Sequence, residues 1–348
     1  MMKSVGQSIL MIAMAMAVAS ISYAQAKTDS IAENMLVYQR AIGGWPKAVN
    51  EVKVDYTKTL SPAAKFATYA DMNRNDATID NEATFKEINY LVKAYQTTGN
   101  KAYLASAEKG VRFLLKAQDA NGGWPQYYPD SSLYRSAITF NDNAMMHVMQ
   151  VLDNVANKKN GFDVIDPSLV EPSAQAIKKG IECILKTQIK VDGKLTAWNQ
   201  QYDKKTLKPV MARKFELVGI TPSESTEIVK FLMKVPNPSP EIKAAVKAAV
   251  EWFEAVKIKG YHFEHIKDAK QPGGKDAVLV ADPNATTWAR YYEIGTNKPF
   301  FSGRDSQKKY SVAEIEVERR AGYAWYGNWP QQLLDKEYPV WAKKYLQN

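Results

Sequence analysis

The chain has 348 residues, of which 45% are hydrophobic and 24% charged, and this composition excludes an extensively disordered protein. A single cysteine, Cys183, excludes an internal disulfide and with it a small disulfide-stapled scaffold. The net charge of +9 favours an anionic partner. Because the positive residues are spread along the chain and form no long block, we do not expect that partner to be a nucleic acid.

The first 26 residues have the pattern of a secretory signal. Lys3 precedes an apolar run over 9–21, and the small residues of 22–26 offer cleavage after residue 24 or 26. The run is short for a membrane span, so we expect no membrane association after cleavage. Loss of Lys3 changes the charge from +9 to +8. These features predict a bacterial secreted or periplasmic monomer, with one domain over 27–348.

The remaining chain is mostly helical by its apolar periodicity. Helices are expected at 31–42, 85–97, 103–118, 143–156, 174–187, 225–233, 240–256, 312–324 and 331–345. Between them we expect polar, irregular chain at 48–77, an extended segment at 188–202, loops with short extended pieces at 258–283, and a helical turn at 288–292. No change in composition marks a second domain.

A weak internal repeat runs through these elements. Residues 113–118 resemble 183–188, and each segment is followed by a turn and an aromatic-glutamine stretch. The Gly-Gly-Trp-Pro loop at 122–125 has echoes at 43–46 and 327–330. Repeated helix pairs with similar loops predict helices stacked in a ring, with the loops gathered on one face where function usually resides.

Two similar oxygen-rich stretches open predicted helices. Thr-Phe-Asn-Asp-Asn-Ala occupies 139–144, and Thr-Ile-Asp-Asn-Glu-Ala occupies 78–83. In the simplest interpretation they are helix N-caps, whose oxygens accept hydrogen bonds from unpaired backbone N–H groups. Alternatively, Asp80, Asn81 and Asp142 converge on a cation such as calcium. In a third interpretation, Asp80 and Asp142 are the carboxylic acid pair of a glycoside hydrolase.

Other familiar chemistries have little support in the sequence. Three histidines and one cysteine are too few for the usual zinc cluster, and neither a phosphate-binding loop nor a nucleophile elbow is present. Arg213, Arg290 and Arg304 each lie among aromatic or small residues. Taken singly, each suits an ordinary surface or aromatic-stacked arginine. Together, in a basic protein, they favour a cleft that binds carboxylates.

Several of these segments resemble the pectate lyases of polysaccharide lyase family ten. The likeness covers roughly residues 35–340 and is carried by 122–129, 138–144, 196–203, 208–213 and 301–305. It implies a mainly α fold, a short α/α toroid of the (α/α)3 type with long loops and a few short strands. It also implies cleavage of α-1,4-linked polygalacturonate by calcium-assisted anti β-elimination, which gives 4,5-unsaturated oligogalacturonides.

The same resemblance implies roles for individual residues. Arg213 matches the catalytic base, and an arginine in that role needs surroundings that lower its proton affinity. Asp80, Asn81 and Asp142 match positions that bind calcium or lie beside it, with Asp80 also catalytic. Lys186, Arg290 and Arg304 match residues that bind substrate carboxylates. The alternatives are a glycoside hydrolase on an α/α toroid, using Asp80 and Asp142, and a non-catalytic pectin-binding protein.

Overall fold

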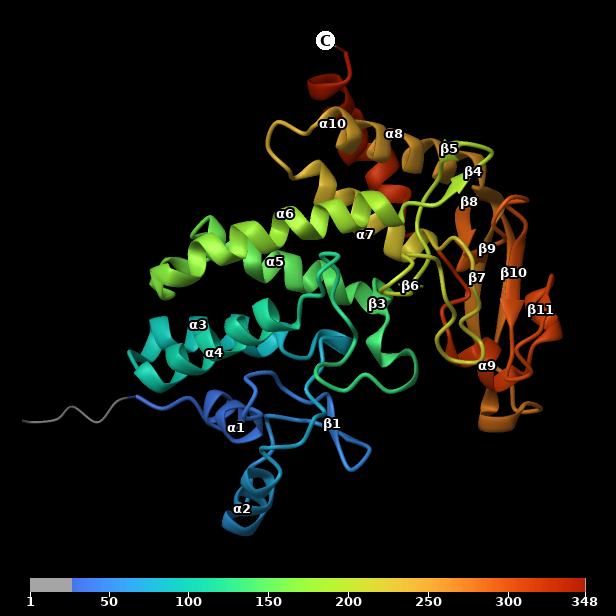
Figure 1. The fold of residues 1–348 in the computed structure, drawn as a ribbon. Coiled ribbons are helices and arrows are strands. Elements are labelled where there is room, and N and C mark those ends of the chain that lie inside the picture. Colours follow the sequence, from blue (N-terminus) through green and yellow to red (C-terminus); the bar gives the residue numbers. More distant parts are fainter. Residues whose placement is uncertain (1–26, 348) are drawn as a thin grey trace, which may run out of the picture.

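A computed structural model describes residues 27–347, so the predicted signal segment 1–26 lies outside the described residues. The described chain is mainly helical, and its strands are short except in one hairpin, which confirms the predicted mainly α class (Figure 1). None of its helices in 27–347 is long and apolar enough to span a membrane. The single domain and the closed toroid stay predictions.

The α-helices are α1 (Ser30–Tyr38), α2 (Pro62–Ala70), α3 (Phe85–Thr98), α4 (Lys101–Ala117), α5 (Ala144–Ala156), α6 (Val170–Thr187), α7 (Pro222–Met233), α8 (Pro240–Ala255), α9 (Val317–Gly322) and α10 (Tyr338–Tyr345). A π-helical turn, η8 (Leu333–Glu337), leads into α10. Two 3-10 turns matter for the site: η1 (Asp80–Glu82) and η3 (Asn141–Asn143).

The strands are β1 (Ala48–Val49), β2 (Val52–Lys53), β3 (Ile138–Thr139), β4 (Lys190–Val191), β5 (Lys194–Leu195), β6 (Gln201–Tyr202), β7 (Ile258–Lys267), β8 (Lys275–Ala289), β9 (Tyr291–Tyr292), β10 (Pro299–Ser302), β11 (Lys308–Lys309) and β12 (Tyr326–Gly327). All their pairings are antiparallel. The sheets are ordered β12-β8-β7 and β11-β10-β9, with three two-stranded pairs.

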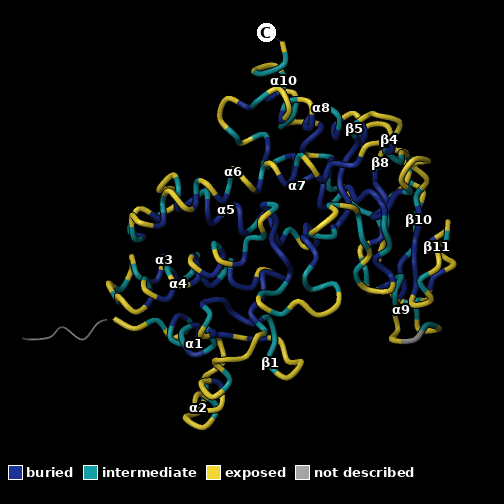
Figure 2. The backbone as a smooth tube through the Cα atoms, viewed as in Figure 1, coloured by how far each residue is buried: buried dark blue, intermediate teal, exposed yellow. Residues whose placement is uncertain are grey.

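The predicted helices from α3 to α8 are confirmed to within a few residues, whereas four other predictions are wrong. The predicted helix 312–324 is divided into a 3-10 turn, Val312–Glu314, and the short α9, with an extended Ile315 between them. The supposedly irregular segment 48–77 contains α2, which buries only Thr68 and therefore shows no core-facing stripe (Figure 2). The segment 258–283 belongs to the long β7–β8 hairpin. The expected helical turn at 288–292 is extended, because Trp288 pairs with Gly327 and Tyr292 with Ile220, distant partners that a local pattern does not show.

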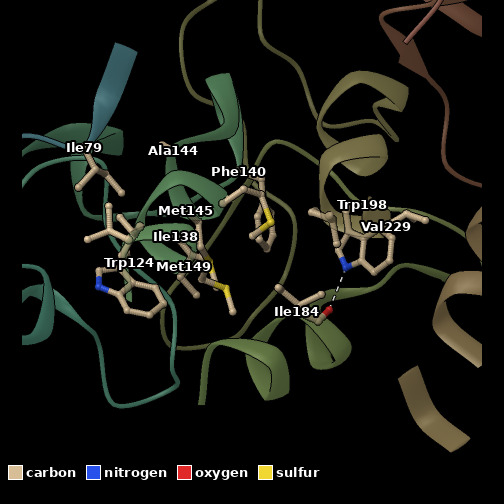
Figure 3. Packing of buried hydrophobic residues seen from close by; sticks show 14 of the residues in the cluster. Ile79, Trp124, Ile138, Phe140, Ala144, Met145, Met149, Ile184, Trp198 and Val229 are labelled. Carbon is tan, nitrogen blue, oxygen red and sulfur yellow. Dashed lines mark hydrogen bonds between the residues drawn. The ribbon is translucent and has the colours of Figure 1, made fainter. Parts of the chain in front are cut away.

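Successive helices pack as pairs: α3 with α4, α5 with α6, and α7 with α8 (Figure 1). A buried tryptophan ties each following loop to the end of its helix. The indole N–H groups of Trp45, Trp124 and Trp198 donate to carbonyl oxygens of the preceding helices at 2.8, 2.7 and 2.8 Å, those of Met35, Leu114 and Ile184. Figure 3 shows the Trp198–Ile184 bond and the apolar side chains around Trp124.

The same three tryptophans also fix where the next segment begins. Their carbonyl oxygens accept hydrogen bonds at 3.0, 3.1 and 2.8 Å from the backbone N–H groups of Thr78, Thr139 and Thr221. η1 follows the first threonine, η3 the second, and α7 the third. We call this arrangement the tryptophan-threonine clamp: the indole N–H donates to the preceding helix, and the tryptophan carbonyl accepts from the threonine N–H. The three clamps place the polar starts of three segments in equivalent positions. The weak sequence repeat has a physical basis in this clamp.

Two helix glycines allow the tryptophans to pack closely, and they provide a test. A Cβ on Gly110 would lie 2.7 Å from Cγ1 of Ile88 and 2.8 Å from the Trp45 ring. We expect Gly110→Ala to lower the free energy of unfolding by about 1–3 kcal/mol, measured by urea denaturation. At Gly180 the nearest atom is the mobile end of Met149, at 2.9 Å. There we expect Gly180→Ala to be tolerated, because alanine favours the helix by about 1 kcal/mol. Equal stability of the two variants would contradict this packing argument.

Candidate functional site

The turns η1 and η3 share one backbone conformation and lie against each other. Asn81 and Asp142 have φ values of 49° and 50°, the left-handed region that asparagine and aspartate tolerate best among residues with a side chain. Neither turn supplies a side-chain cap to the helix that follows. The helix-cap interpretation is therefore wrong, and the polar side chains are available for another role.

In each turn the first residue is buried and the second is exposed. Asp80 and Asn141 are buried, whereas Asn81 and Asp142 are exposed. The exposed pair lines a cavity of about 390 Å³ together with residues from the hairpin β1–β2, α5, α7 and β8–β9. The cavity residues are Lys53, Asn81, Glu82, Asp142, Asn143, His147, Ser223, Glu224 and Arg290. The clamp thus brings oxygen donors from three segment starts to one place.

Asp80 lies behind this cavity and does not line it. The residue is 2% exposed, and its Oδ2 forms an ion pair with Lys47 and accepts a hydrogen bond from Nδ2 of Asn81 at 3.2 Å. Its Oδ1 is buried without a hydrogen-bond partner among the described residues. Asp80 is close enough to act electrostatically on Asp142, but its position does not suit direct contact with a substrate.

The carboxylate of Asp142 is destabilised in its charged form. Protein atoms crowd it and reduce its hydration, which raises its pKa, and the like charges of Asp80 and Glu224 raise the pKa further. Arg290 and Arg213 act in the opposite direction. Asp80, Arg290 and Arg213, three of the predicted residues, thus lie near enough to Asp142 to affect its pKa.

Glu224 is a site residue that the sequence analysis missed. It is 1% exposed, and its Oε1 accepts hydrogen bonds from Nη2 of Arg290 at 2.5 Å and from Nε2 of Gln200 at 3.1 Å. Burial alone would lower the pKa of Arg290, but the Glu224 charge raises it overall. A signal was present in the sequence, because Thr221-Pro222-Ser223-Glu224 follows the third tryptophan as the oxygen-rich stretches follow the first two.

Arg290 is a buried cation directed at the same cavity. Its guanidinium carbon lies 5.2 Å from the ring centre of Tyr323 and 5.6 Å from that of Trp329. Aromatic faces and the Glu224 carboxylate together hold such a group rigidly. The position suits the predicted role in binding a substrate carboxylate, which stays a prediction.

Arg213 lines a second, larger cavity of about 1130 Å³, shared with Arg304. Its guanidinium forms an ion pair with Glu216, with Nε donating to Oε2 at 2.8 Å and Nη2 donating to Oε1. These hydrogen bonds, followed by the Glu216 charge, raise the pKa of Arg213. The structure therefore contradicts the expectation that its surroundings lower its proton affinity. Glu216 was missed, although it stands only three residues after Arg213.

The two remaining predicted residues, Arg304 and Lys186, do not line the smaller cavity that contains Asp142. Arg304 is exposed at the rim of the larger cavity and pairs with Glu318, with Nη2 3.0 Å from Oε1. Lys186 is exposed on the last turn of α6, where its Nζ lies 3.7 Å from Oε2 of Glu182, and it lines neither cavity. Its predicted role has no support from this geometry and stays a prediction.

The donor set suits a partial calcium site. Within 27–347, no cluster of three or more His, Cys, Asp or Glu side chains is arranged to hold a metal ion. However, Oδ1 of Asn141 and Oε2 of Glu224 are buried without partners in the described chain, and the clustered carboxylates repel one another. Calcium takes about six to eight oxygen ligands. Asn81, Asp142 and Glu224 fit part of such a shell, with water and substrate carboxylates as the remaining ligands.

Two solved structures that are similar to this chain are family 10 polysaccharide lyases. The family 10 polysaccharide lyase from Cellvibrio cellulosa is 34% identical, with a TM-score of 0.77 over 91% of each chain. An aspartate-to-alanine mutant of the family 10 polysaccharide lyase from Cellvibrio cellulosa, in complex with trigalacturonic acid, is 33% identical, with a TM-score of 0.77 over 91% of this chain and 92% of that one.

The family model described as pectic acid lyase matches residues 39–334. The chain belongs to this family, and it is an enzyme, a pectate lyase. The predicted resemblance is thus confirmed. No curated protein sequence matches the chain.

The raised pKa of Asp142 predicts a cost in stability. Folding makes this acid hold its proton more tightly, so stability is lost as the pH rises from the ordinary value of 3.8 through the raised pKa. In the presence of a chelator at pH 7, we expect Asp142→Asn to raise the free energy of unfolding by a few tenths to about 1 kcal/mol in urea denaturation. The gain should shrink toward about pH 4.

Asp192→Asn is the matched control, since Asp192 is also exposed with a left-handed φ of 48°. It should show no comparable gain. A loss of stability in Asp142→Asn, relative to this control, would show that the carboxylate supports the fold.

Proposed function

We propose that the enzyme cleaves the α-1,4 links of polygalacturonate by calcium-assisted anti β-elimination, with Arg213 as the base that removes the C5 proton. The observation that carries the proposal is the convergence of Asn81, Asp142 and Glu224 with Arg290 at one cavity, beside Arg213. The solved relative in complex with trigalacturonic acid supports the choice of substrate.

The chemistry requires stabilisation of negative charge on the uronate carboxylate. As the C5–H bond breaks, its electrons form the C4=C5 double bond, the C4–O4 bond breaks, and O4 leaves with its electron pair. Charge accumulates on the adjacent carboxylate in the transition state. The buried, preorganised guanidinium of Arg290 binds and orients that carboxylate. Calcium held by Asn81, Asp142 and Glu224 would withdraw electron density from it.

Arg213 suits the base role by its position, although its pKa is raised. A base with a high proton affinity accepts a proton strongly once it is neutral, but its neutral form is scarce at moderate pH. We therefore expect the rate to rise with pH well into the alkaline range. Arg304, at the rim of the larger cavity that Arg213 lines, would bind a neighbouring uronate carboxylate.

The wider properties of the protein belong to the same proposal. An extracellular or periplasmic enzyme would meet pectate outside the cytoplasm, which agrees with the signal pattern over 1–26 and with the net positive charge. We further infer a monomer in which the helix pairs close into an α/α toroid. The hydrolase alternative loses support because Asp80, one of its two acids, is buried against Lys47.

The reaction type is tested by the ultraviolet absorbance of the product. With polygalacturonate, we expect absorbance from the 4,5-unsaturated uronide, which a calcium chelator abolishes and added calcium restores. Asp142→Ala should lose this calcium-dependent turnover while its circular dichroism stays unchanged. New reducing ends without an ultraviolet signal would instead identify a hydrolase. Substrate binding without either product would identify a binding protein.

The base assignment is tested at Arg213. We expect Arg213→Ala and Arg213→Lys to lower kcat by at least about a thousandfold, because the C5 proton loses its acceptor. Binding of trigalacturonate, measured by calorimetry, should change much less. Arg112→Ala, which removes an exposed arginine paired with Asp166, is the control. If Arg213→Ala keeps more than about a tenth of the activity, another group is the base.

A further inference from the structure

We propose that Glu216 is a positioning residue that makes Nη1 of Arg213 the proton-accepting atom. This inference rests on the proposed function, in which Arg213 is the base. It adds a residue that acts through the base and does not itself touch the substrate.

The hydrogen bonds of the pair leave one nitrogen available. Nε of Arg213 donates to Oε2 of Glu216 at 2.8 Å, and Nη2 donates to Oε1. Nη1 makes no hydrogen bond within residues 27–347. A neutral guanidine has a single imine nitrogen with a basic lone pair. Because the carboxylate keeps protons on Nε and Nη2, that nitrogen is Nη1.

This arrangement is equivalent to fixing a tautomer. In a serine protease triad, an aspartate keeps a proton on one histidine nitrogen so that the other accepts the proton in catalysis. Here Glu216 keeps protons on two arginine nitrogens and leaves the third without a hydrogen bond, in a residue that lines the larger cavity. In the step itself, Nη1 gains the proton that C5 loses, and the guanidinium that forms is already paired with Glu216.

Glu216 is held in place by its own contacts. It is 3% exposed, and its Oε2 also accepts a hydrogen bond from the backbone N–H of Arg213 at 3.1 Å. The backbone N–H of Glu216 donates to the Arg213 carbonyl at 2.8 Å, which closes a tight turn. The guanidinium carbon of Arg213 lies 4.9 Å from the ring centre of Phe215. The ring centres of Phe215 and Tyr323 are 5.7 Å apart. The Glu216 carboxylate is therefore fixed in the core, and it anchors an Arg213 side chain that is 46% exposed.

The surrounding charges define the expected pH effect. Glu216, Tyr323 and Asp142 all raise the pKa of Arg213. Cations lower the pKa of a nearby guanidinium and acids raise it. The charged residues that line the cavity with Arg213 are Asp203, Lys204, Lys205, Lys214 and Arg304. Removal of the Glu216 charge should therefore lower the pKa of Arg213 and increase its neutral fraction at a given pH. The same change removes the constraint on which nitrogen is basic.

The experiment is a double-variant cycle in kcat on polygalacturonate, using Glu216→Gln and Arg213→Lys. In the native background we expect Glu216→Gln to lower kcat by about 10- to 100-fold. This change is the loss caused by a wrongly oriented basic nitrogen, partly offset by the larger neutral fraction of Arg213. KM, and the Kd for trigalacturonate, should change by less than about threefold. The alkaline rise of kcat should level off at a lower pH than in the native enzyme.

Lysine has one nitrogen and no tautomer to select. In the Arg213→Lys background, we therefore expect Glu216→Gln to change the residual kcat by less than about threefold. Equal losses in both backgrounds would overturn the proposal, because Glu216 would then support only the local fold. A rise in KM at constant kcat would also overturn it. Glu216→Asp, which keeps the charge, serves as a second variant if Glu216→Gln fails to fold, and it should keep the native pH profile with a smaller loss of kcat.

Failure of the proposed function gives a different result. If Arg213→Ala retains activity, Arg213 is not the base, whatever Glu216→Gln does. If Arg213→Ala is inactive and Glu216→Gln is not impaired, the base assignment stands and the positioning role falls. Glu251→Gln is the matched control, because Glu251 is an exposed glutamate paired with Lys247 on α8.

Discussion

The geometry of this enzyme depends on the clamp in which one buried tryptophan joins a finished helix to the start of the next segment. The indole N–H satisfies a carbonyl in the last turn of the helix, and the tryptophan carbonyl receives the N–H of a threonine. Both bonds are buried, so breaking either one leaves an unsatisfied polar group at a cost of about 1–3 kcal/mol. Three copies of this clamp deliver Asn81, Asp142 and Glu224 to one cavity.

The site combines like charges that the fold alone does not require. Asp80 and Glu224 repel the Asp142 carboxylate, while Lys47 pairs with Asp80 and Arg290 pairs with Glu224. Such an arrangement is costly without a cation or an anionic ligand to complete it. At Arg213 the effect is the opposite of that at Asp142, because Glu216 stabilises the charged form of the side chain. The neutral base is therefore rare, and its reactivity once formed is correspondingly high.

Much of the fold could be predicted from the sequence, because α3 to α8 carry regular apolar faces. α2 has no such face, and the β7–β8 hairpin is defined by partners outside its own segment, so neither was visible locally. At the site, the repeated oxygen-rich stretches identified Asp142 and Asn81. Glu224 was missed because its partner Arg290 is 66 residues away in the sequence. Glu216 is only three residues from Arg213, but the sequence does not show that its side chain is buried and turned back onto that arginine.

The left-handed turns η1 and η3 have a consequence for precision. Each turn begins two residues after a threonine whose backbone is tied directly to the core, so its position depends on a short path of bonds. Errors in position accumulate with the length of flexible chain between a group and its anchor. Because the anchors are alike and the paths equally short, thermal displacements of Asn81 and Asp142 relative to each other stay small. The spacing of ligands in the cavity is thereby set by the core packing and is insensitive to the long loops around it.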